Sequence, residues 1–213
     1  MKNILIIGMG DFGQYLAFRL TQLHHQVCIV DSDSNIINML SNEYPNAYTG
    51  DCMQIVTLKE LGVQNFDICI VAIGENFQAS LEITNNLKEL GAQYIITKSS
   101  SDIQSKFLQM AGADDVVYPD RDIAEKIAVR CNATNLFDYI QISNQYSIFE
   151  VKVKKNWVGR SIKELDIRNK YDVNVIAISN KGVVSMPTPS YVFYEGDHVY
   201  LFGKDSVIKK LKD

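Results

Sequence analysis

Short apolar runs alternate with longer amphipathic segments over the first 118 residues. The runs are continuously apolar, which is typical of strands in a parallel sheet that is covered on both faces. The segments between them place apolar residues at helical spacing, and two of them stop at a glycine, Gly62 or Gly91. This alternation with short loops predicts a doubly wound α/β domain. We expect strands at 4–7, 27–30, 46–49, 67–73, 94–97 and 116–118, and helices at 14–24, 33–44, 55–61, 77–90 and 102–110.

The pattern changes beyond the last of these runs. Residues 120–131 carry Ile123, Ile127 and Cys131 at helical spacing; we expect this helix to contact a second copy of the chain, with packing on its own domain as the alternative. Residues 148–154 alternate apolar and polar, as in a half-exposed antiparallel strand. We also expect a connector at 136–140, a short helix from Ser161, strands at 173–179, 183–186, 192–194 and 198–202, a turn at 195–197 and a helix at 205–211.

The chain of 213 residues has room for two modest domains, and the change of pattern places their boundary near residue 132. We expect a Rossmann-like, doubly wound parallel sheet over residues 1–132, which include the crossover helix, and a small α+β domain over residues 133–213. The second domain would be marginally stable alone, so docking or dimerisation should support it.

The composition excludes several classes of protein. A net charge of −4 leaves no basic footprint, so nucleic acid is not an expected partner. No apolar run approaches the ~18 residues of a membrane span, and Met1 leads almost directly into the first strand, which leaves no room for a signal peptide. We therefore expect a cytoplasmic protein, in which four reduced cysteines pack as small apolar residues: Cys28, Cys52, Cys69 and Cys131.

The first strand runs directly into a glycine-rich turn. Gly8, Gly10 and Gly13 form the pattern G-x-G-x-x-G before an amphipathic segment, and Asp31 ends the next apolar run 18 residues after Gly13. In a dinucleotide-binding unit the first glycine allows the turn, the second lets a phosphate approach, and the third lets helix and strand pack closely. The acid accepts from a ribose 2′-OH, which disfavours NADP. The pattern predicts nucleotide binding; a Rossmann unit that has lost its ligand is the alternative.

Ligands of doubly wound sheets bind beyond the carboxyl ends of the strands. Residues that follow the predicted strands should therefore lie around one crevice. They are the glycine turn, Asp31, the pair Asp51-Cys52, the pair Ile73-Gly74 and Lys98. We expect the nucleotide in this crevice.

Residues suited to catalysis are scarce. The three histidines are His24 and His25, at the end of the first helix, and His198, which begins a strand of the second domain and is expected on the surface. No G-x-S-x-G, H-E-x-x-H or G-K-[ST] pattern occurs. We therefore favour a nucleotide-reading regulatory protein over an enzyme. An NAD-linked oxidoreductase or redox sensor is one alternative, and a nucleotide-binding regulator with a different partner is another.

Several stretches, together with the glycine turn, resemble one known family. They are V-A-I-G-E-N-F-Q-A-S at 71–80, A-G-A-D at 111–114, Y-P-D-R-D at 118–122, D-I-R-N-K-Y at 166–171 and N-V-I-A-I at 174–178. The chain is similar over nearly its whole length to the RCK family (regulator of conductance of potassium), the gating subunits of Ktr/Trk potassium uptake systems. The resemblance implies an N-terminal Rossmann-like domain, a C-terminal RCK_C domain and no catalysis. It also implies dimers that form an octameric ring on the cytosolic face of a membrane-embedded potassium-translocating subunit, with ATP, ADP or NAD(H) as the controlling ligand.

The resemblance assigns roles around the predicted crevice. The glycines would hold the phosphates, Asp31 would hold the ribose, and Asp51 and Cys52 would contact the adenine edge. Ile73, Gly74 and Lys98 would line the far side of the crevice. Asp120 matches an acid that helps some relatives bind a divalent cation near the phosphates; capping of the next helix is its alternative role. The expected nucleotide-binding residues are Gly8, Met9, Gly10, Asp11, Phe12, Gly13, Asp31, Ser32, Asp51, Cys52, Ile73, Gly74 and Lys98.

Asp11 departs from the family pattern, because relatives of the Ktr type usually have an arginine there that meets the phosphates. At ~4 Å and an effective dielectric constant of ~20, repulsion between Asp11 and one phosphate charge is on the order of 4 kcal/mol before screening. A less charged ligand such as NAD(H), ADP or AMP then competes with ATP as the expected ligand. The alternative is that Asp11 turns outward and caps the helix.

The second domain of some relatives binds cyclic di-AMP at its dimer interface. Arg168 would pair with a phosphate through its planar guanidinium, and apolar residues would hold the purines. The alternative is that Ile167, Val175 and Ile176 belong to the core and that Arg168 is a surface ion-pair residue. The matching positions are Ile167, Arg168, Asn174, Val175, Ile176 and Pro187.

Overall fold

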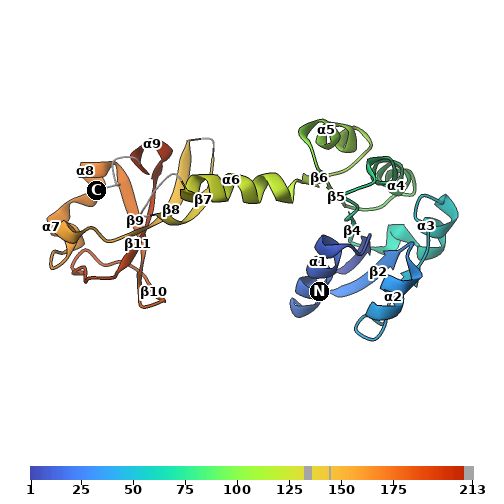
Figure 1. Cartoon of the computed structure of the whole chain (residues 1–213), viewed down its shortest axis with the longest axis horizontal. Helices are drawn as coiled ribbons and strands as arrows, with labels where there is room; N and C mark the ends of the chain where they lie inside the picture. Colours follow the sequence, from blue (N-terminus) through green and yellow to red (C-terminus); the bar gives the residue numbers. More distant parts are fainter. Residues whose placement is uncertain (132–135, 144, 209–213) are drawn as a thin grey trace. The chain divides into compact units, whose positions relative to one another are not determined.

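The computed structural model describes residues 1–131, 136–143 and 145–208 of the chain (Figure 1). The chain divides into two compact units, Met1–Asp120 and Arg121–Asp213. The predicted boundary between residues 132 and 133 lies outside the described residues. Within the described ranges, no helix has both the length and the apolar composition that are needed to cross a bilayer.

The first unit is built on a six-stranded parallel sheet. Its strands are β1 (Asn3–Ile7), β2 (Gln26–Asp31), β3 (Ala47–Thr49), β4 (Ile68–Val71), β5 (Ile95–Lys98) and β6 (Asp115–Val117). They lie in the order β3-β2-β1-β4-β5-β6, so the central strands β1 and β4 come from the most continuous apolar runs. The predicted Rossmann-like, doubly wound parallel sheet is confirmed.

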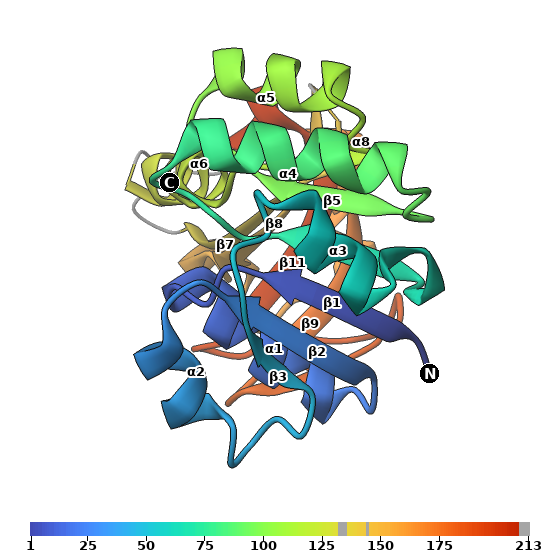
Figure 2. The ribbon, with the colours of Figure 1, turned by 90° about the vertical axis from the view of Figure 1, so that its right-hand side faces the viewer.

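Helices cover both faces of this sheet. They are α1 (Asp11–Gln22), α2 (Ser34–Leu40), α3 (Ile55–Leu61), α4 (Phe77–Glu89) and α5 (Asp102–Met110), with a 3-10 turn η1 at Val63–Asn65. Ala17 of α1 and Ile37 of α2 pack against one face of β1 and β2. Leu58 of α3 and Ile83 of α4 pack against the other face. Helix α5 lies beside α4 in both views (Figures 1 and 2).

Local signals explain where these helices begin and end. Asp33, Asn76 and Ser101 each accept a hydrogen bond from a backbone N–H in the first turn of α2, α4 and α5. Gly62 has a φ of 66° and ends α3 in the left-handed conformation that favours glycine. Helix α1 begins at Asp11, three residues earlier than the amphipathic pattern predicts.

The second unit contains a five-stranded antiparallel sheet. Its elements follow α6 (Pro119–Cys131) and are β7 (Leu136–Gln141), β8 (Tyr146–Lys152), the 3-10 turn η2 (Lys155–Trp157), α7 (Ile162–Leu165), α8 (Ile167–Tyr171), β9 (Val173–Asn180), β10 (Val183–Ser185), β11 (His198–Lys204) and α9 (Asp205–Ile208). The strand order is β10-β9-β11-β8-β7. Phe149, Trp157 and Phe193 are fully buried in the core of this unit.

Two predicted elements of the second unit are wrong. The segment 136–140, expected as a connector, is β7, because Ile142 N and Ser143 N donate to Tyr146 O and close a hairpin with β8. The segment 192–194, expected as a strand, forms only an isolated bridge from Val192 to Ser161, so it pairs with the loop before α7 and not with the sheet. Helix α8 was not expected. The predicted terminal helix is described only to Ile208, and its residues 209–211 lie outside the described part.

The apolar residues of α6 are exposed in the single chain. Ile123 is 54% exposed and Ile127 is 52% exposed, so the described residues leave the predicted stripe largely uncovered. Contact of this stripe with a second copy stays a prediction. Cys131, which belongs to the same stripe, is also exposed in the single chain, so its packing stays a prediction too, whereas Cys28, Cys52 and Cys69 are buried free thiols as expected.

Candidate functional site

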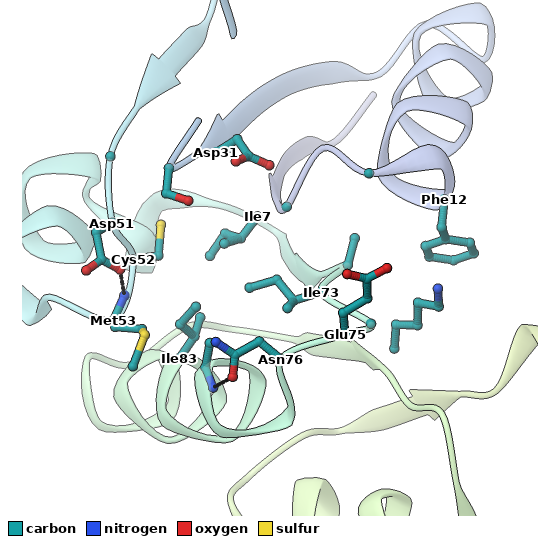
Figure 3. A pocket seen from close by; sticks show the side chains of 18 of the residues that line it. Ile7, Phe12, Asp31, Asp51, Cys52, Met53, Ile73, Glu75, Asn76 and Ile83 are labelled. Carbon is teal, nitrogen blue, oxygen red and sulfur yellow. Dashed lines mark hydrogen bonds between the residues drawn. The ribbon is translucent and has the colours of Figure 1, made fainter. Parts of the chain in front are cut away.

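The strand order of the first unit reverses at β1, which pairs with β2 on one side and with β4 on the other. The following connections leave in opposite directions, and a crevice opens beyond the carboxyl ends of β1 and β4. A cavity of about 530 Å³ occupies this position (Figure 3). It is lined by Ile7, Gly8, Gly10, Asp11, Phe12, Asp31, Ser32, Gly50, Asp51, Cys52, Met53, Ala72, Ile73, Gly74, Glu75, Asn76, Ala79, Ile83 and Lys98.

The three glycines of the turn have different environments. Gly8 has a φ of 96°, and a Cβ there would lie 2.9 Å from Ile73 Cγ1. A Cβ on Gly13 would lie 2.1 Å from the carbonyl oxygen of Gly8, so α1 can approach β1 only without a side chain there. A Cβ on Gly10 would meet nothing within 4 Å, and its φ of −66° and ψ of −177° suit any residue. The fold therefore requires Gly8 and Gly13, whereas Gly10 leaves open space at the cavity.

Helix α1 begins at this turn without a capping side chain, because its N-cap residue is Gly10. Side chains do cap α2, α4 and α5. The first backbone N–H groups of the 12-residue helix α1 therefore lack a side-chain acceptor at a place that borders the cavity. Such N–H groups and the helix dipole favour an anion, so this end of the cavity fits a nucleotide phosphate.

The carboxylate of Asp31 is fixed at the end of β2. Its Oδ2 accepts a hydrogen bond from Met9 N at 2.6 Å, and its Oδ1 accepts one from Asp33 N at 2.9 Å. An ionised carboxylate offers about four lone-pair sites, so both oxygens can accept further bonds. Figure 3 shows the group at the cavity, between Asp51 on one side and Phe12 on the other. It is therefore placed to accept from the hydroxyls of a ribose.

Asp51, Cys52 and Met53 line the end of the cavity that follows β3 (Figure 3). Asp51 Oδ1 accepts from Met53 N at 2.9 Å, which fixes the turn before α3. Cys52 is 3% exposed, and burial, followed by the negative charges of Asp51 and Asp31, raises the pKa of its thiol to about 12. The thiol is therefore protonated at neutral pH and is not a nucleophile. Ile83 of α4 adds an apolar wall at this end.

The opposite end of the cavity follows β4 and β5. Lys98 Nζ lies 5.5 Å from the centroid of the Phe12 ring, and a Cβ on Gly74 would lie 3.0 Å from the same nitrogen. Lys98 therefore passes close over Gly74 towards α1. Ser100 Oγ donates to Gly74 O at 3.1 Å, which ties the loop after β5 to the loop after β4. The side chain of Glu75 is directed into the cavity (Figure 3).

Most of the residues predicted for the nucleotide site line this cavity. Met9 and Gly13 do not, because Met9 is fully buried in the core and Gly13 lies against the carbonyl of Gly8. The predicted residues that the structure brings together here are Gly8, Gly10, Asp11, Phe12, Asp31, Ser32, Asp51, Cys52, Ile73, Gly74 and Lys98.

The two alternative capping roles are wrong. Asp11 is the first residue of α1, whose N-cap is Gly10, so Asp11 is not the N-cap residue, and it is among the residues that line the cavity. Asp120 lies inside α6, after Pro119, and is not among the residues that line the cavity. Over the part of the chain that the structure describes, no group of three or more His, Cys, Asp or Glu residues could hold a metal ion.

A second cavity, of about 330 Å³, lies in the second unit. Ile167 is 1% exposed and belongs to the core, as the alternative for this residue predicts, although it also contributes to the cavity wall. Arg168 is exposed and makes no ion pair with any described residue. Ile176, where the register between β9 and β11 shifts, is not among the lining residues. The predicted cyclic di-AMP positions that line the cavity are Ile167, Arg168, Asn174, Val175 and Pro187.

Two family models match the chain: the TrkA-N domain over residues 4–119 and the TrkA-C domain over residues 147–213. The Ktr system potassium uptake protein C of Bacillus subtilis (strain 168) is 35% identical over 212 residues, which cover 99% of this chain and 96% of that relative. The chain belongs to the RCK family of Ktr/Trk potassium uptake systems.

Further comparisons agree with the RCK assignment. The Ktr system potassium uptake protein A of the same organism is 32% identical over 213 residues, covering 100% of this chain and 96% of the relative. The crystal structure of the GsuK RCK domain superposes with a TM-score of 0.72 at 21% identity, covering 99% of this RCK chain and 47% of that chain. The RCK chain thus spans about half of that solved chain, and the likeness shows a shared fold.

Several residues that line the RCK cavity were not predicted from the sequence. Met53 follows Cys52 and Glu75 follows Gly74, so an extension of the strand-end rule by one residue finds both. Ala79 and Ile83 lie one turn apart on the inner face of α4. Their spacing predicts burial, but no local signal shows that this face reaches the nucleotide crevice. The complete set of additional residues is Ile7, Gly50, Met53, Ala72, Glu75, Asn76, Ala79 and Ile83.

Proposed function

We propose that this RCK subunit binds an adenine nucleotide in the cavity beyond β1 and β4 and reports its occupancy to a membrane-embedded potassium-translocating subunit. The observation that supports this best is the uncapped start of α1, which meets Gly10 and Asp31 in one cavity. The first N–H groups of α1 would hold the phosphates, and Asp31 would accept from the ribose. Cys52 and Ile83 would face the adenine, since purine sites are largely apolar.

The role would be regulatory and would depend on assembly. We propose cytoplasmic dimers that form an octameric ring on the cytosolic face of the membrane, with the exposed residues of α6 in the dimer contact. A nucleotide that binds one arrangement of the ring better than another shifts the population towards it, and the membrane subunit responds. The shift cannot exceed the difference in affinity of the nucleotide for the two arrangements.

The charge of the cavity favours a ligand with few phosphates. Among the described residues that line it, four are carboxylates and one, Lys98, is a cation. Asp11 stands at the start of α1, where the phosphates would lie, so each added phosphate meets a like charge. We therefore propose ADP or NAD(H) ahead of ATP. Asp31 would repel the additional phosphate of NADP.

The second cavity is the proposed site for cyclic di-AMP. Lys163 and Arg168 line it, and the planar guanidinium of Arg168 could donate hydrogen bonds to two phosphate oxygens. Ile167 and Val175 provide an apolar wall for a purine. The location in the second unit means that this ligand and the nucleotide occupy separate sites.

An NAD-linked oxidoreductase or redox sensor is the competing function. The thiol in the cavity, Cys52, has a pKa raised to about 12 by burial, so it is poorly suited to redox exchange. His198 lies in the second unit with Nδ1 2.6 Å from Glu150 Oε1. Absorbance of the reduced nicotinamide over a panel of substrates decides between the two functions, because steady turnover would contradict the regulatory role.

Calorimetric titration of the full chain with ATP, ADP, NADH and cyclic di-AMP tests the proposal. We expect ADP and NADH to bind more tightly than ATP, and Gly10→Val to abolish nucleotide binding while cyclic di-AMP still binds. The chain should also restore potassium-limited growth together with its membrane partner, and Gly10→Val should not. Absence of binding for every adenine nucleotide would refute the proposed function.

A further inference from the structure

The cavity extends well beyond the half that suits adenosine. In a sheet of this strand order a dinucleotide lies across the crevice, with its adenosine over β2 and β3 and its second nucleoside over β4 and β5. Glu75 follows β4, and its carboxylate is directed into the cavity between Ile73 and Phe12 (Figure 3). A group bound in the second half, which we call the distal half, therefore faces Glu75 and not Asp31 or Asp51.

The distal half carries excess negative charge. Asp31 and Asp51 accept hydrogen bonds from backbone N–H groups, which stabilise their charge. The side-chain carboxylates of Asp11 and Glu75 have no hydrogen bond or ion pair to any residue within the described ranges. Lys98 does not offset Glu75 directly, since its ammonium lies over the Phe12 ring and not within ion-pair distance of that carboxylate.

The two redox forms of NAD differ in the charge of this second half alone. The oxidised nicotinamide ring carries one positive charge and the reduced ring carries none, whereas the adenosine, the riboses and the two phosphates are the same. The contacts of the adenosine and phosphates therefore cancel in a comparison of the two forms. What is left is the interaction of the ring with Glu75, Asp11 and Lys98, together with the aromatic face of Phe12, which attracts a cation.

We propose that Glu75 is a specificity-determining residue, which makes the cavity bind the oxidised dinucleotide NAD⁺ more tightly than NADH. This inference rests on the proposed adenine-nucleotide site and names the redox form that this site selects. Lys98, whose ammonium lies close to Gly74 and the Phe12 ring, would bind the phosphates, while Glu75 would face the nicotinamide ring. The subunit then responds to the oxidised fraction of the NAD pool and performs no redox step itself.

The expected preference is modest because Glu75 is exposed at the cavity rim. Partly solvated charge pairs contribute up to about 1 kcal/mol, which corresponds to roughly fivefold in affinity. We therefore expect NAD⁺ to bind about fivefold more tightly than NADH. The preference should weaken as salt is added, because screening acts on exposed charges.

Calorimetric titration of the full chain with NAD⁺, NADH, ADP-ribose and ADP tests this inference. We expect Glu75→Gln to bring the NAD⁺ and NADH affinities within twofold of each other, while ADP-ribose, which lacks the nicotinamide, keeps the same or slightly higher affinity. Glu82→Gln is the matched control: it removes the same charge from α4, the helix that follows the loop of Glu75, at a position outside the cavity, and should leave the fivefold ratio unchanged.

The outcomes separate this inference from the proposed function. Equal affinities in the unsubstituted chain, or tighter binding of NADH, would overturn the role of Glu75 even if ADP and ADP-ribose bind well. An unchanged ratio in Glu75→Gln would overturn it too. If none of the four ligands binds, the nucleotide site itself is wrong.

Discussion

Gly10 and Gly13 stand three residues apart in one turn, yet the structure needs them for different reasons. A Cβ on Gly13 would collide with the Gly8 carbonyl, whereas a Cβ on Gly10 would enter open space at the cavity. We predict that Gly10→Val removes adenine-nucleotide binding and lowers the free energy of unfolding by at most about 1 kcal/mol, the scale of an N-cap change. Calorimetric titration with ADP and a urea denaturation curve measure the two effects.

Gly13→Ala is the contrasting variant. Its methyl group has to displace backbone, so we expect it to lower the free energy of unfolding by about 3 kcal/mol. If Gly10→Val binds ADP normally, the phosphates do not lie at the start of α1. If both variants destabilise the chain equally, the distinction between a glycine for the ligand and a glycine for the fold is wrong.

Asp11 provides a second test at the scale of one side chain. The residue lies in the first turn of α1 and lines the cavity, so Asp11→Arg exchanges a negative for a positive charge beside the phosphates. We predict at least a tenfold rise in the affinity for ATP relative to ADP, because the third phosphate gains most. Asp115→Arg makes the same exchange outside the cavity and should leave the ratio unchanged. An unchanged ratio in Asp11→Arg would mean that the terminal phosphate lies elsewhere.

Single residues show how far the sequence predicts the site. The positions of Gly8, Asp31 and Lys98 follow from strand ends, since the carboxyl ends of parallel strands share one edge. The hydrogen bond from Met9 N to the carboxylate of Asp31 and the position of Ile83 at the cavity cannot be predicted in this way. Both depend on distances between separate elements, which periodicity along the chain does not contain.

At the scale of elements, the four-residue helix α7 depends on its first turn. Ser161 Oγ accepts from Glu164 N, and Glu164 Oε2 accepts from Ser161 N at 2.8 Å, which forms the capping box that the sequence predicts. The backbone hydrogen bond from Ser161, and then its hydroxyl, lower the pKa of Glu164. A carboxyl group whose pKa is lowered by folding stabilises the folded state above its unfolded pKa, and the effect is lost as the pH falls through the folded value.

We therefore predict that Glu164→Ala destabilises the second unit at pH 7 and that the difference from the unsubstituted chain shrinks below about pH 4, where the carboxylate is protonated. Trp157 is the single tryptophan of the chain and is buried in this unit, so its fluorescence follows the urea unfolding of this unit. Glu164→Gln keeps a side-chain acceptor without a charge and should show a smaller dependence on pH. A difference that stays constant from pH 7 to pH 3 would contradict the role of the carboxylate.

The turn before β11 depends on a buried carboxylate, and this dependence could not be predicted from the sequence. Asp197 is fully buried, and its carboxylate accepts from Asn180 Nδ2 at 2.5 Å, from Tyr191 OH at 2.9 Å and from Tyr194 N at 2.9 Å. We predict that Asp197→Ala lowers the free energy of unfolding by about 2–4 kcal/mol, because three donors lose their acceptor. Its exposed neighbour provides the control: Glu195→Ala should change the value by less than about 0.5 kcal/mol. Equal effects of the two substitutions, by Trp157 fluorescence, would refute the role of the buried carboxylate.

Elements with strong local signals were predicted well, and elements defined by distant pairing were not. The apolar runs of β1 and β4 predict these strands, and the glycine that ends α3 predicts the end of this helix, without information from the rest of the chain. The hairpin partner of β8 and the isolated bridge from Val192 to Ser161 depend on which segments meet in space. In the same way, β11 pairs with β8 and β9, although β8 lies about 50 residues away along the chain.

At the scale of the whole molecule, charge is unevenly divided between the two units. The first 120 residues contain 14 acidic and 6 basic side chains, whereas the remaining 93 contain 11 acidic and 15 basic ones. An acidic unit repels highly charged nucleotides, and a basic unit attracts anions. Both effects act over a distance that shortens as the salt concentration rises. This division supports the two proposals made above, a weakly charged ligand for the first cavity and a dianionic cyclic dinucleotide for the second.

A regulatory subunit with two ligand sites must obey reciprocity. If cyclic di-AMP and the nucleotide shift one equilibrium between ring arrangements, each changes the affinity of the other by the same factor, typically 5- to 150-fold. We predict that saturating cyclic di-AMP changes the dissociation constant of ADP by such a factor and that saturating ADP changes that of cyclic di-AMP equally. Calorimetric titrations of the assembled full chain, each with the other ligand already bound, provide both values.

Two variants make this last prediction specific. Arg168→Ala should remove cyclic di-AMP binding and, with it, the effect of cyclic di-AMP on ADP, while ADP alone binds as before. Gly10→Val should remove the effect of ADP on cyclic di-AMP in the converse experiment. If both ligands bind to the unsubstituted chain but neither affects the other, the two sites do not act on a shared equilibrium, and a gating mechanism would need the membrane subunit to join them.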